Sequence, residues 1–421
     1  MTWLQQVIDR GQQIDDWLSP LRLQAIETLQ QAAWPTRRTE SWKYTSLAAL
    51  EQQQLRLAQP ATPPAEPPQT AIPGLNSLDL LFVNGVLQTD ISQLPLAAGL
   101  QLHTLRSASA IQRVITTSMY AQVKPQRHLF GLVNDVLANE VLFIDIAHDS
   151  HIEQPIRIIS RVSEGQESHH RVLVRVGDRA TVTIIEQTQS EHASFSTGFT
   201  EIELGEQAKL EHYRLVMHTR QAIYFGGCHI CLHDKAELNS TMLGYGSELS
   251  RTDIDIMHNG QHARAKLNAI YLLGESEHFD LHSTIEHAKP HGSTEENVRG
   301  IVGDKANAVF NGRIHIHRGA QKTQAALQNR NLLLSRRGQI NTKPELEIYA
   351  DDVQCAHGAT VAEIAEEALY YLRTRGICRS KALIMLNFGF IQELINQMPN
   401  PLLAQWLEPQ LRARFKEMEV R

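Results

Sequence analysis

A weak internal repeat constrains the fold of this chain more than any other feature of its sequence. A turn motif of the form Gly/His-Asp/Glu-x-Ala recurs, and its alanine falls at Ala180, Ala208 and Ala236, at intervals of 28 and 28 residues. A looser version, NGQHA, ends at Ala263 after 27 more residues. A fixed period of this length indicates stacked structural units, each of which buries its apolar face against its neighbours.

The segments between these turns favour β-structure over other repeat architectures. Each unit holds two short runs of apolar residues that alternate with polar ones, such as RVLVRV and TVTIIEQ, and this is the pattern of strands. A helical solenoid needs helix formers in every unit, and a propeller blade needs four strands and roughly 40 residues. We therefore predict a mainly β fold, a right-handed parallel β-helix of two-strand coils of about 28 residues. The motif returns as GDKA at Ala306, 43 residues after Ala263, which we interpret as a coil of different length.

Helical patterns flank this β-region and divide the chain into four predicted parts. Residues 1–58 form an N-terminal helical region, whose first run ends at Trp34-Pro35 because the residue before proline disfavours helix. Residues 59–75 form a linker, since QPATPPAEPPQTAIP holds six prolines that favour an extended chain. The β-helix core occupies 76–360, and a C-terminal helical domain occupies 361–421.

Start and stop signals divide the C-terminal domain into helices. Thr360 and Glu363 form a T-x-x-E capping box, Gly376 ends the first helix, and Ser380 caps the second. The second helix runs to Pro399, and a last short helix follows around 402–407. We expect these amphipathic helices to cap the open end of the β-helix or to offer an apolar groove to a partner.

Composition excludes several functional classes. The net charge of −6 argues against nucleic-acid binding, which needs a basic surface. No run of about 18 apolar residues occurs, so no membrane span is predicted, and the polar N-terminus lacks the apolar centre of a signal peptide. The four cysteines, Cys228, Cys231, Cys355 and Cys378, are too few for a disulfide framework, so we expect a cytoplasmic protein in a reducing environment.

Sequence motifs of self-contained enzymes are missing. The chain contains no G-x-x-x-x-G-K-[ST] phosphate loop, no G-x-G-x-x-G after a strand, no G-x-S-x-G and no H-E-x-x-H. A nucleotide-hydrolysing enzyme or a zinc hydrolase is therefore not expected, and we predict that the chain is not an enzyme.

Two histidine-rich segments are interpreted as ordinary strands. In Cys228-His229-Ile230-Cys231-Leu232-His233, strand alternation puts Cys228 and Cys231 on opposite faces, whereas His229, Cys231 and His233 share one face. A zinc site on C-x-x-C needs a tight knuckle and a second ligand pair, so a coil without metal is the simpler interpretation. Arg313, His315 and His317 also alternate, against Ile314 and Ile316, which indicates a solvated sheet face.

The segment LEIYADDVQCAHGAT, which ends at Thr360, holds the strongest chemical signal. Cys355 and His357 stand two residues apart in a strand-like run, so their side chains share a face. A thiol and an imidazole can ligate a soft transition metal or part of an iron–sulfur cluster. Two ligands do not complete such a site, so the pattern predicts that another chain supplies the rest.

Four long segments carry a family resemblance. They are RRTESWKYTSLAAL (37–50), FNGRIHIHRGAQKTQAALQNRNLLLS (310–335), TKPELEIYADDVQCAHGATV (342–361) and YYLRTRGI (370–377). Together they closely resemble the SufB/SufD family of iron–sulfur cluster assembly proteins. The SufD branch is the better match, because the SufB branch carries a cysteine where this chain has Leu332 beside Asn331.

The resemblance implies a role and a set of partners. It implies a non-catalytic scaffold subunit of a SufBCD-type complex, with a SufB-like subunit bound through the last β-helix strands, 345–358. A SufC-like ABC ATPase would dock on the helices of 361–398, which agrees with the missing phosphate loop. His357 and Cys355 would be ligands of iron or a nascent cluster shared with the SufB-like subunit. Iron or the cluster would be held transiently in the complex, and no cofactor is expected in the isolated chain.

Two alternatives stay open on the sequence alone. Many parallel β-helices cleave polysaccharides with surface carboxylates, and Asp253, Asp255 and Glu286 with Arg251 are candidates for such a site. The final strands could also pair with the same edge of a second copy and form a homodimer.

Overall fold

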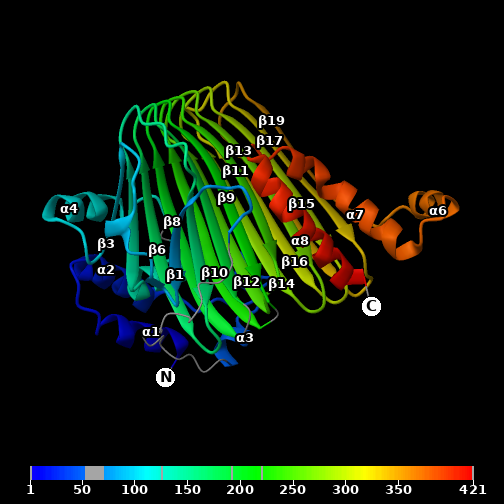
Figure 1. The fold of residues 1–421 in the computed structure, drawn as a ribbon, viewed down its shortest axis with the longest axis horizontal. Helices are drawn as coiled ribbons and strands as arrows, with labels where there is room; N and C mark the ends of the chain where they lie inside the picture. The colour runs from blue at the N-terminus through cyan, green and yellow to red at the C-terminus, as the bar shows by residue number, and fades with distance from the viewer. Residues whose placement is uncertain (1, 53–70, 125–126, 191–192, 220, 420–421) are drawn as a thin grey trace.

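Two long β-sheets lie face to face and form a solenoid with helices on both outer sides (Figure 1). The structure is a computed structural model that describes residues 2–52, 71–124, 127–190, 193–219 and 221–419. Most of the predicted linker at 59–75 lies outside the described residues.

Sheet A contains ten strands and sheet B nine. In spatial order, sheet A consists of β19 (Gln354–Ala362), β17 (Gln324–Leu333), β15 (Ser293–Val302), β13 (Arg264–Leu273), β11 (Glu237–Tyr245), β9 (Lys209–His218), β7 (Thr181–Ser190), β5 (Ile156–Val162), β1 (Leu78–Val83) and β2 (Val86–Leu87). Sheet B consists of β18 (Gln339–Ile348), β16 (Asn307–Ile316), β14 (His278–His287), β12 (Leu249–His258), β10 (Ala222–Leu232), β8 (Ser194–Leu204), β6 (Glu167–Val176), β4 (Glu140–Ile146) and β3 (Leu100–Thr104).

The helices lie before, beside and after the strands. They are α1 (Trp3–Gly11), α2 (Ser19–Gln31), α3 (Ala48–Gln52), α4 (Ala110–Met119), α5 (Leu129–Leu137), α6 (Glu366–Thr374), α7 (Arg379–Asn396) and α8 (Pro401–Glu419), with short 3-10 turns at Glu40–Trp42 and Ile91–Gln93. No described helix is both long and apolar enough to cross a lipid bilayer. Helices α4 and α5 fall inside 76–360, where the sequence pattern indicated only strands.

The strand order confirms the predicted parallel β-helix. From β4 to β19, successive strands alternate between the two sheets, and each pairs in parallel with the strand two places away. Thr181 lies beside Lys209, and Lys209 beside Glu237, so one coil is 28 residues here. The inward-facing apolar residues of both sheets form one continuous core, as a two-layer solenoid requires.

The turn motif marks corners of the solenoid. Ala180, Ala208, Ala236 and Ala263 are buried at the entry to strands of sheet A, and the residue before each has a positive φ. Ala306, by contrast, precedes β16 in sheet B. The 43-residue interval is therefore about one and a half coils and not a coil of different length, so that interpretation is wrong. The motif has moved to the opposite edge, where a small buried residue again fits the corner.

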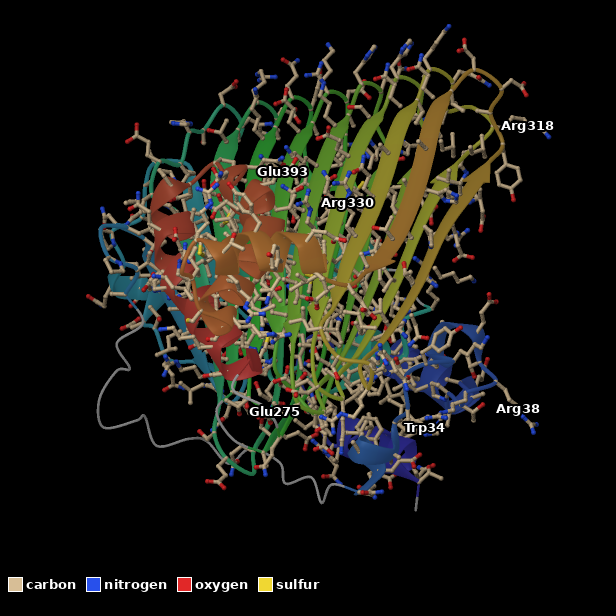
Figure 2. The ribbon with its side chains drawn as sticks, turned by 90° about the vertical axis from the view of Figure 1, so that its right-hand side faces the viewer. Trp34, Arg38, Glu275, Arg318, Arg330 and Glu393 are labelled. Carbon is tan, nitrogen blue, oxygen red and sulfur yellow. The ribbon has the colours of Figure 1, made fainter. Side chains whose placement is uncertain are left out.

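Different helices cover the two outer faces. Apolar residues of α7 and α8 pack on sheet A against Leu215, Ile270 and Ile301, and α1, α2 and α5 pack on sheet B against Phe195 and Phe225. Figure 2 shows the C-terminal helices and the N-terminal segment with Trp34 and Arg38 on opposite sides of the strands. The C-terminal helices therefore lie beside the sheets. The first of our two expectations, that they cap the open end of the solenoid, is wrong.

Helix boundaries at the C-terminus differ from the predicted ones. Strand β19 continues through Thr360 to Ala362, because it pairs along its length with β17, so the predicted capping box is wrong. The N-cap of α7 is Cys378 and not Ser380, and the predicted short last helix is the 19-residue α8. Gly376 does follow α6 with φ +78, which confirms it as the left-handed residue that ends this helix.

Candidate functional site

The solenoid is closed at one end and open at the other. At the N-terminal end, Leu87, Ile91, Leu94, Leu96 and Leu102 pack against the interior core. At the C-terminal end, β18 and β19 are the last strands of their sheets and have a paired neighbour on one side only. Edge strands with free backbone donors and acceptors are ready to pair with another chain. The open end of the solenoid is therefore the part of the molecule best suited to form an interface by strand pairing.

Cys355 and His357 lie on the interior-facing side of the last coil. In the parallel pairing of β17 and β19, Cys355 is opposite Ala325 and His357 is opposite Leu327. Ala325 and Leu327 belong to the buried core, and side chains in register on neighbouring strands share a face. The predicted juxtaposition of the thiol and the imidazole is therefore consistent with the strand geometry.

The two side chains differ in their surroundings. Cys355 is partly buried against the core, and this burial raises the pKa of its thiol, so the free chain holds it protonated at neutral pH. His357 is exposed, and within the described part of the chain its ring has no hydrogen-bond or ion-pair partner. It is therefore available to a group that comes from outside.

Mostly apolar residues occupy the inward positions of the two last strands. The inward positions are Ile340, Thr342, Pro344, Leu346 and Ile348 on β18 and Cys355, His357, Ala359 and Val361 on β19. Below them, Asn329 and Asn331 are buried and linked by a 2.7 Å hydrogen bond. Thr342 donates to Asn329 at 2.8 Å. Sequence reasoning missed these asparagines, whose signal was a polar residue at an inward position of a strand.

The other predicted residues lie elsewhere. His315 and Arg313 point outward from β16 and both contact Glu347, at 2.8 Å each, while His317 contacts Glu286. Ile314 and Ile316 are fully buried, as the alternation predicted. The carboxylates considered for sugar cleavage, Asp253 and Asp255, are buried and contact His128.

Two groups of potential metal ligands occur in the described body of the solenoid. Glu186, His212 and Cys228 meet inside it, and His128, His229 and Asp255 meet on the outer face of sheet B. The segment around Cys228 thus divides its ligands between two faces. In the interior group the Arg214 guanidinium already binds Glu186 at 2.8 Å and occupies the place of a cation.

Helix α6 projects from the body of the molecule beside the open end (Figure 1). Tyr370 and Tyr371 on α6 are 69% and 56% exposed, and Met385 on α7 is 43% exposed. Large side chains exposed together on a projecting helix are typical of a surface that a partner covers.

The fold and the open end define a class of parallel β-solenoid proteins with helices on both outer faces. Two family descriptions match the chain: "SUF system FeS cluster assembly, SufBD core domain" over residues 158–390 and "SufBD protein N-terminal region" over residues 5–158. The chain belongs to the SufBD family of iron–sulfur cluster assembly proteins, and within it to the SufD type. The resemblance found in the sequence is confirmed.

Curated relatives agree with this assignment. The chain is 29% identical over 395 residues to the iron–sulfur cluster assembly protein SufD of Escherichia coli (strain K12). The aligned region covers 92% of this chain and 90% of that protein. An iron–sulfur cluster assembly SufBD family protein of Synechocystis sp. is 28% identical over 410 residues, or 93% of this chain and 88% of the relative. The protein SufB of Bacillus subtilis is 24% identical over 284 residues, or 66% of this chain and 60% of that protein.

Proposed function

We propose that this chain is a scaffold subunit of a SufBCD-type complex and supplies ligands for iron or a nascent cluster at its open end. The observation that carries the proposal is the exposed His357 ring beside Cys355, between two unpaired strand edges. Neither residue completes a ligand set within the described chain, so a SufB-like partner has to add the remaining ligands. Its role would be structural and not catalytic.

The chemistry of the pair suits a cluster that is held and then released. Imidazole is a borderline ligand and thiolate a soft one, and a mixed set binds iron. Cys355 has to lose its proton to ligate, and binding of a metal supplies the positive charge that lowers the pKa of a thiol. The iron or cluster is the cargo of the complex and not a resident cofactor of this chain.

We assign the ATPase-docking surface to α6 and the start of α7. The exposed tyrosines Tyr370 and Tyr371 support it, since aromatic side chains commonly anchor interfaces. On this proposal Tyr370→Ala in the co-expressed complex lowers retention of the SufC-like ATPase and leaves the SufB-like subunit bound. Unchanged ATPase retention in the double Tyr370→Ala/Tyr371→Ala variant would refute this assignment.

The metal-ligand role is tested by co-expression with SufB-like and SufC-like subunits and anaerobic spectroscopy of the purified assembly. We expect His357→Ala to abolish cluster absorption while the complex still forms, and Cys355→Ser to reduce it. His148→Ala is the matched control, because His148 is also exposed but precedes β5 near the closed end. Normal cluster yield from the His357 variant would remove this residue from the site.

The homodimer is a second candidate, since the same two edges that fit a SufB-like chain also fit a second copy. Light scattering on the isolated chain, and on its mixture with the SufB-like subunit, distinguishes a homodimer from the mixed complex. The proposal expects the SufB-like subunit to displace any self-association. The cytoplasmic location stays a prediction from the sequence.

A further inference from the structure

The group formed by His128, His229 and Asp255 lies far from the open end, in the middle of sheet B. His229 on β10 and Asp255 on β12 are direct neighbours in the parallel register. Their neighbours along each strand, Cys228 and Ile254, face the core, so His229 and Asp255 face outward. His128 is the N-cap residue of α5, which packs on this face.

Two imidazoles converge on one carboxylate oxygen. His128 Nε2 is 2.7 Å and His229 Nδ1 is 2.8 Å from Asp255 Oδ2. The two rings are stacked with centroids 5.3 Å apart. The side chains are 9%, 0% and 11% exposed for His128, His229 and Asp255, so little water reaches the oxygen that they share.

We propose that His128, His229 and Asp255 form a binding site for a divalent first-row transition ion of the ferrous class. Two histidines and one carboxylate on one face of an ion, with open positions opposite, are the ligand set that Fe(II) takes in many proteins. Ligand bonds of about 2.1 Å at right angles put ligand atoms roughly 3.0 Å apart. The two nitrogen–oxygen distances to Asp255 therefore need to widen by only a few tenths of an ångström, and all three ligand atoms lie within 4.8 Å of one another.

Without an ion, the hydrogen bonds are poorly balanced. If His229 donates from Nδ1 to Asp255, its buried Nε2 is left as an acceptor without a partner. If His128 donates from Nε2, its Nδ1 faces Asp253 Oδ1 at 3.6 Å, so a lone pair meets a carboxylate. An ion bound to His128 Nε2 puts the ring proton on Nδ1, and His128 Nδ1–H then points at Asp253, in the arrangement that commonly orients metal-bound histidines. The buried Nε2 of His229 has no partner among the described residues with or without the ion.

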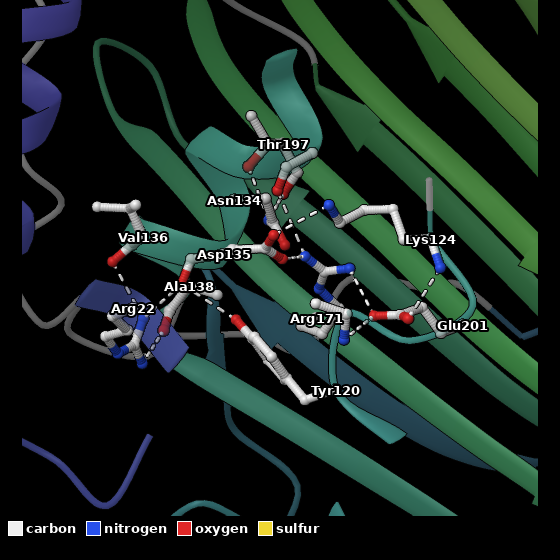
Figure 3. Close-up of polar contacts among 12 residues, drawn as sticks. Arg22, Tyr120, Lys124, Asn134, Asp135, Val136, Ala138, Arg171, Thr197 and Glu201 are labelled. Carbon is white, nitrogen blue, oxygen red and sulfur yellow. Dashed lines mark hydrogen bonds and ion pairs between the residues drawn. The ribbon is translucent and has the colours of Figure 1, made fainter. Parts of the chain in front are cut away.

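The segment at 121–124 is anchored to sheet B, and Arg127 beside the site is partly exposed. The backbone N–H groups of Ala121, Val123 and Lys124 donate to the Glu201 carboxylate at 2.9 to 3.1 Å, which ties residues 121–124 to β8 (Figure 3). Arg127 binds the other oxygen of Asp255. Its side chain is 45% exposed, so it can swing into solvent as an ion enters.

Titration of the purified, chelator-treated full chain tests the site, with Co(II) under anaerobic conditions as an optical probe and Fe(II) as competitor. We expect one Co(II) per chain with visible d–d bands, and displacement by Fe(II). His128→Ala should raise the Kd at least about tenfold, and Arg127→Ala should lower it because a competing cation is removed. Asp255→Asn keeps the shape of the side chain and removes its charge, so loss of Co(II) binding in this variant is not explained by misfolding.

Matched controls separate this site from other ligands. His282→Ala removes a histidine that pairs with Asp280 at 2.9 Å on the same sheet but belongs to neither group of potential metal ligands among the described residues, and it should leave the Kd unchanged. His357→Ala should also leave it unchanged, so failure of the proposed interface and failure of this site are distinguishable. Absence of saturable binding, equal Kd values in the wild type and His128→Ala, or weaker binding by Arg127→Ala would overturn the proposal.

Discussion

At the scale of the residue, buried charges in this solenoid are used in connected networks. The Arg171 guanidinium, fully buried, pairs with Glu201 at 2.9 Å and with Asp135. Lys124 joins Asp135 at 2.9 Å. Figure 3 shows how this network ties Asp135 of α5 and Lys124 to sheet B. Because this network lies next to the proposed metal site, an intact network matters for the stability of the fold and for the geometry of that site.

Removing Arg171 should be costly. Arg171→Met leaves two carboxylates with too little positive charge in a buried place, so we expect the free energy of unfolding to fall by about 3–5 kcal/mol. Urea denaturation measures it. Arg179→Ala, which removes an exposed pair with Asp149, is the control and should cause no measurable change. Equal stability of the two variants would contradict the network argument.

A second residue-scale prediction concerns pH. Glu296 occupies an inward position two strands from His357, in the row Glu296, Leu327 and His357. Burial raises the pKa of its carboxyl group from 4.5 to about 7. The folded chain therefore holds this proton between about pH 4.5 and 7 while the unfolded chain has lost it, so stability falls as pH rises through that window.

Glu296→Gln should remove this pH dependence. The free energy of unfolding of the variant minus that of the wild type should rise by roughly 2.5 kcal/mol between pH 5 and 8, because most of the effect of a shift of about 2.5 pKa units falls within this interval. Urea titrations at both pH values give the difference. A difference that is the same at pH 5 and pH 8 would show that Glu296 is already ionised in the folded chain.

At the scale of the element, β19 is the strand most exposed to pairing. The Gln354 N–H donates to Thr323 of the preceding coil, and the N–H groups of a strand alternate in direction. Those of Cys355, His357, Ala359 and Val361 therefore point away from β17 and are free for a partner. The edge of the last coil, and not a deep pocket, is the recognition surface that the proposed function uses.

A proline in this edge should block pairing without unfolding the chain. Ala359→Pro removes an N–H that points away from β17, and proline is tolerated where the N–H of an edge strand is unpaired. We expect loss of the SufB-like subunit in pull-down with an unchanged melting temperature to within a few degrees. Gly358→Pro removes an N–H that points toward β17, so it should lower the melting temperature as well. Retained binding by Ala359→Pro would show that the interface does not use this edge.

At the scale of the whole molecule, the helices are part of the core and not additions to it. Leu403, Leu407, Leu411 and Phe415 of α8 are almost completely buried against sheet A. Together with α7 they cover an outer sheet face that is apolar in its own right. The solenoid needs this layer, whereas its last coil stays uncovered.

Deletion of residues 363–421 tests this distinction. The truncated chain should expose the apolar face around Leu243, Ile270 and Ile301, so we expect strong binding of an apolar dye and aggregation. The comparison is a shorter deletion within α6, 366–374, which removes exposed tyrosines and should leave the chain monodisperse. A well-behaved long truncation would mean that α7 and α8 serve docking alone.

The sequence by itself determined the strands, the coil length and the neighbourhood of Cys355 and His357. These depend on local properties, a period of two and a period of 28, which can be counted along the chain. The helix start predicted at Thr360 was not determined in this way, because pairing with β17 overrode a capping signal.

Only the tertiary structure decided which end of the solenoid is open, which face α8 covers, and which side chains meet across long distances in sequence. His128 and Asp255 are 127 positions apart, and nothing near either of them predicts the other. Stacking of the coils brings His229 beside Asp255, and packing of α5 then delivers His128. Such contacts come from the register between coils and the docking of layers, which a pattern along one strand does not contain.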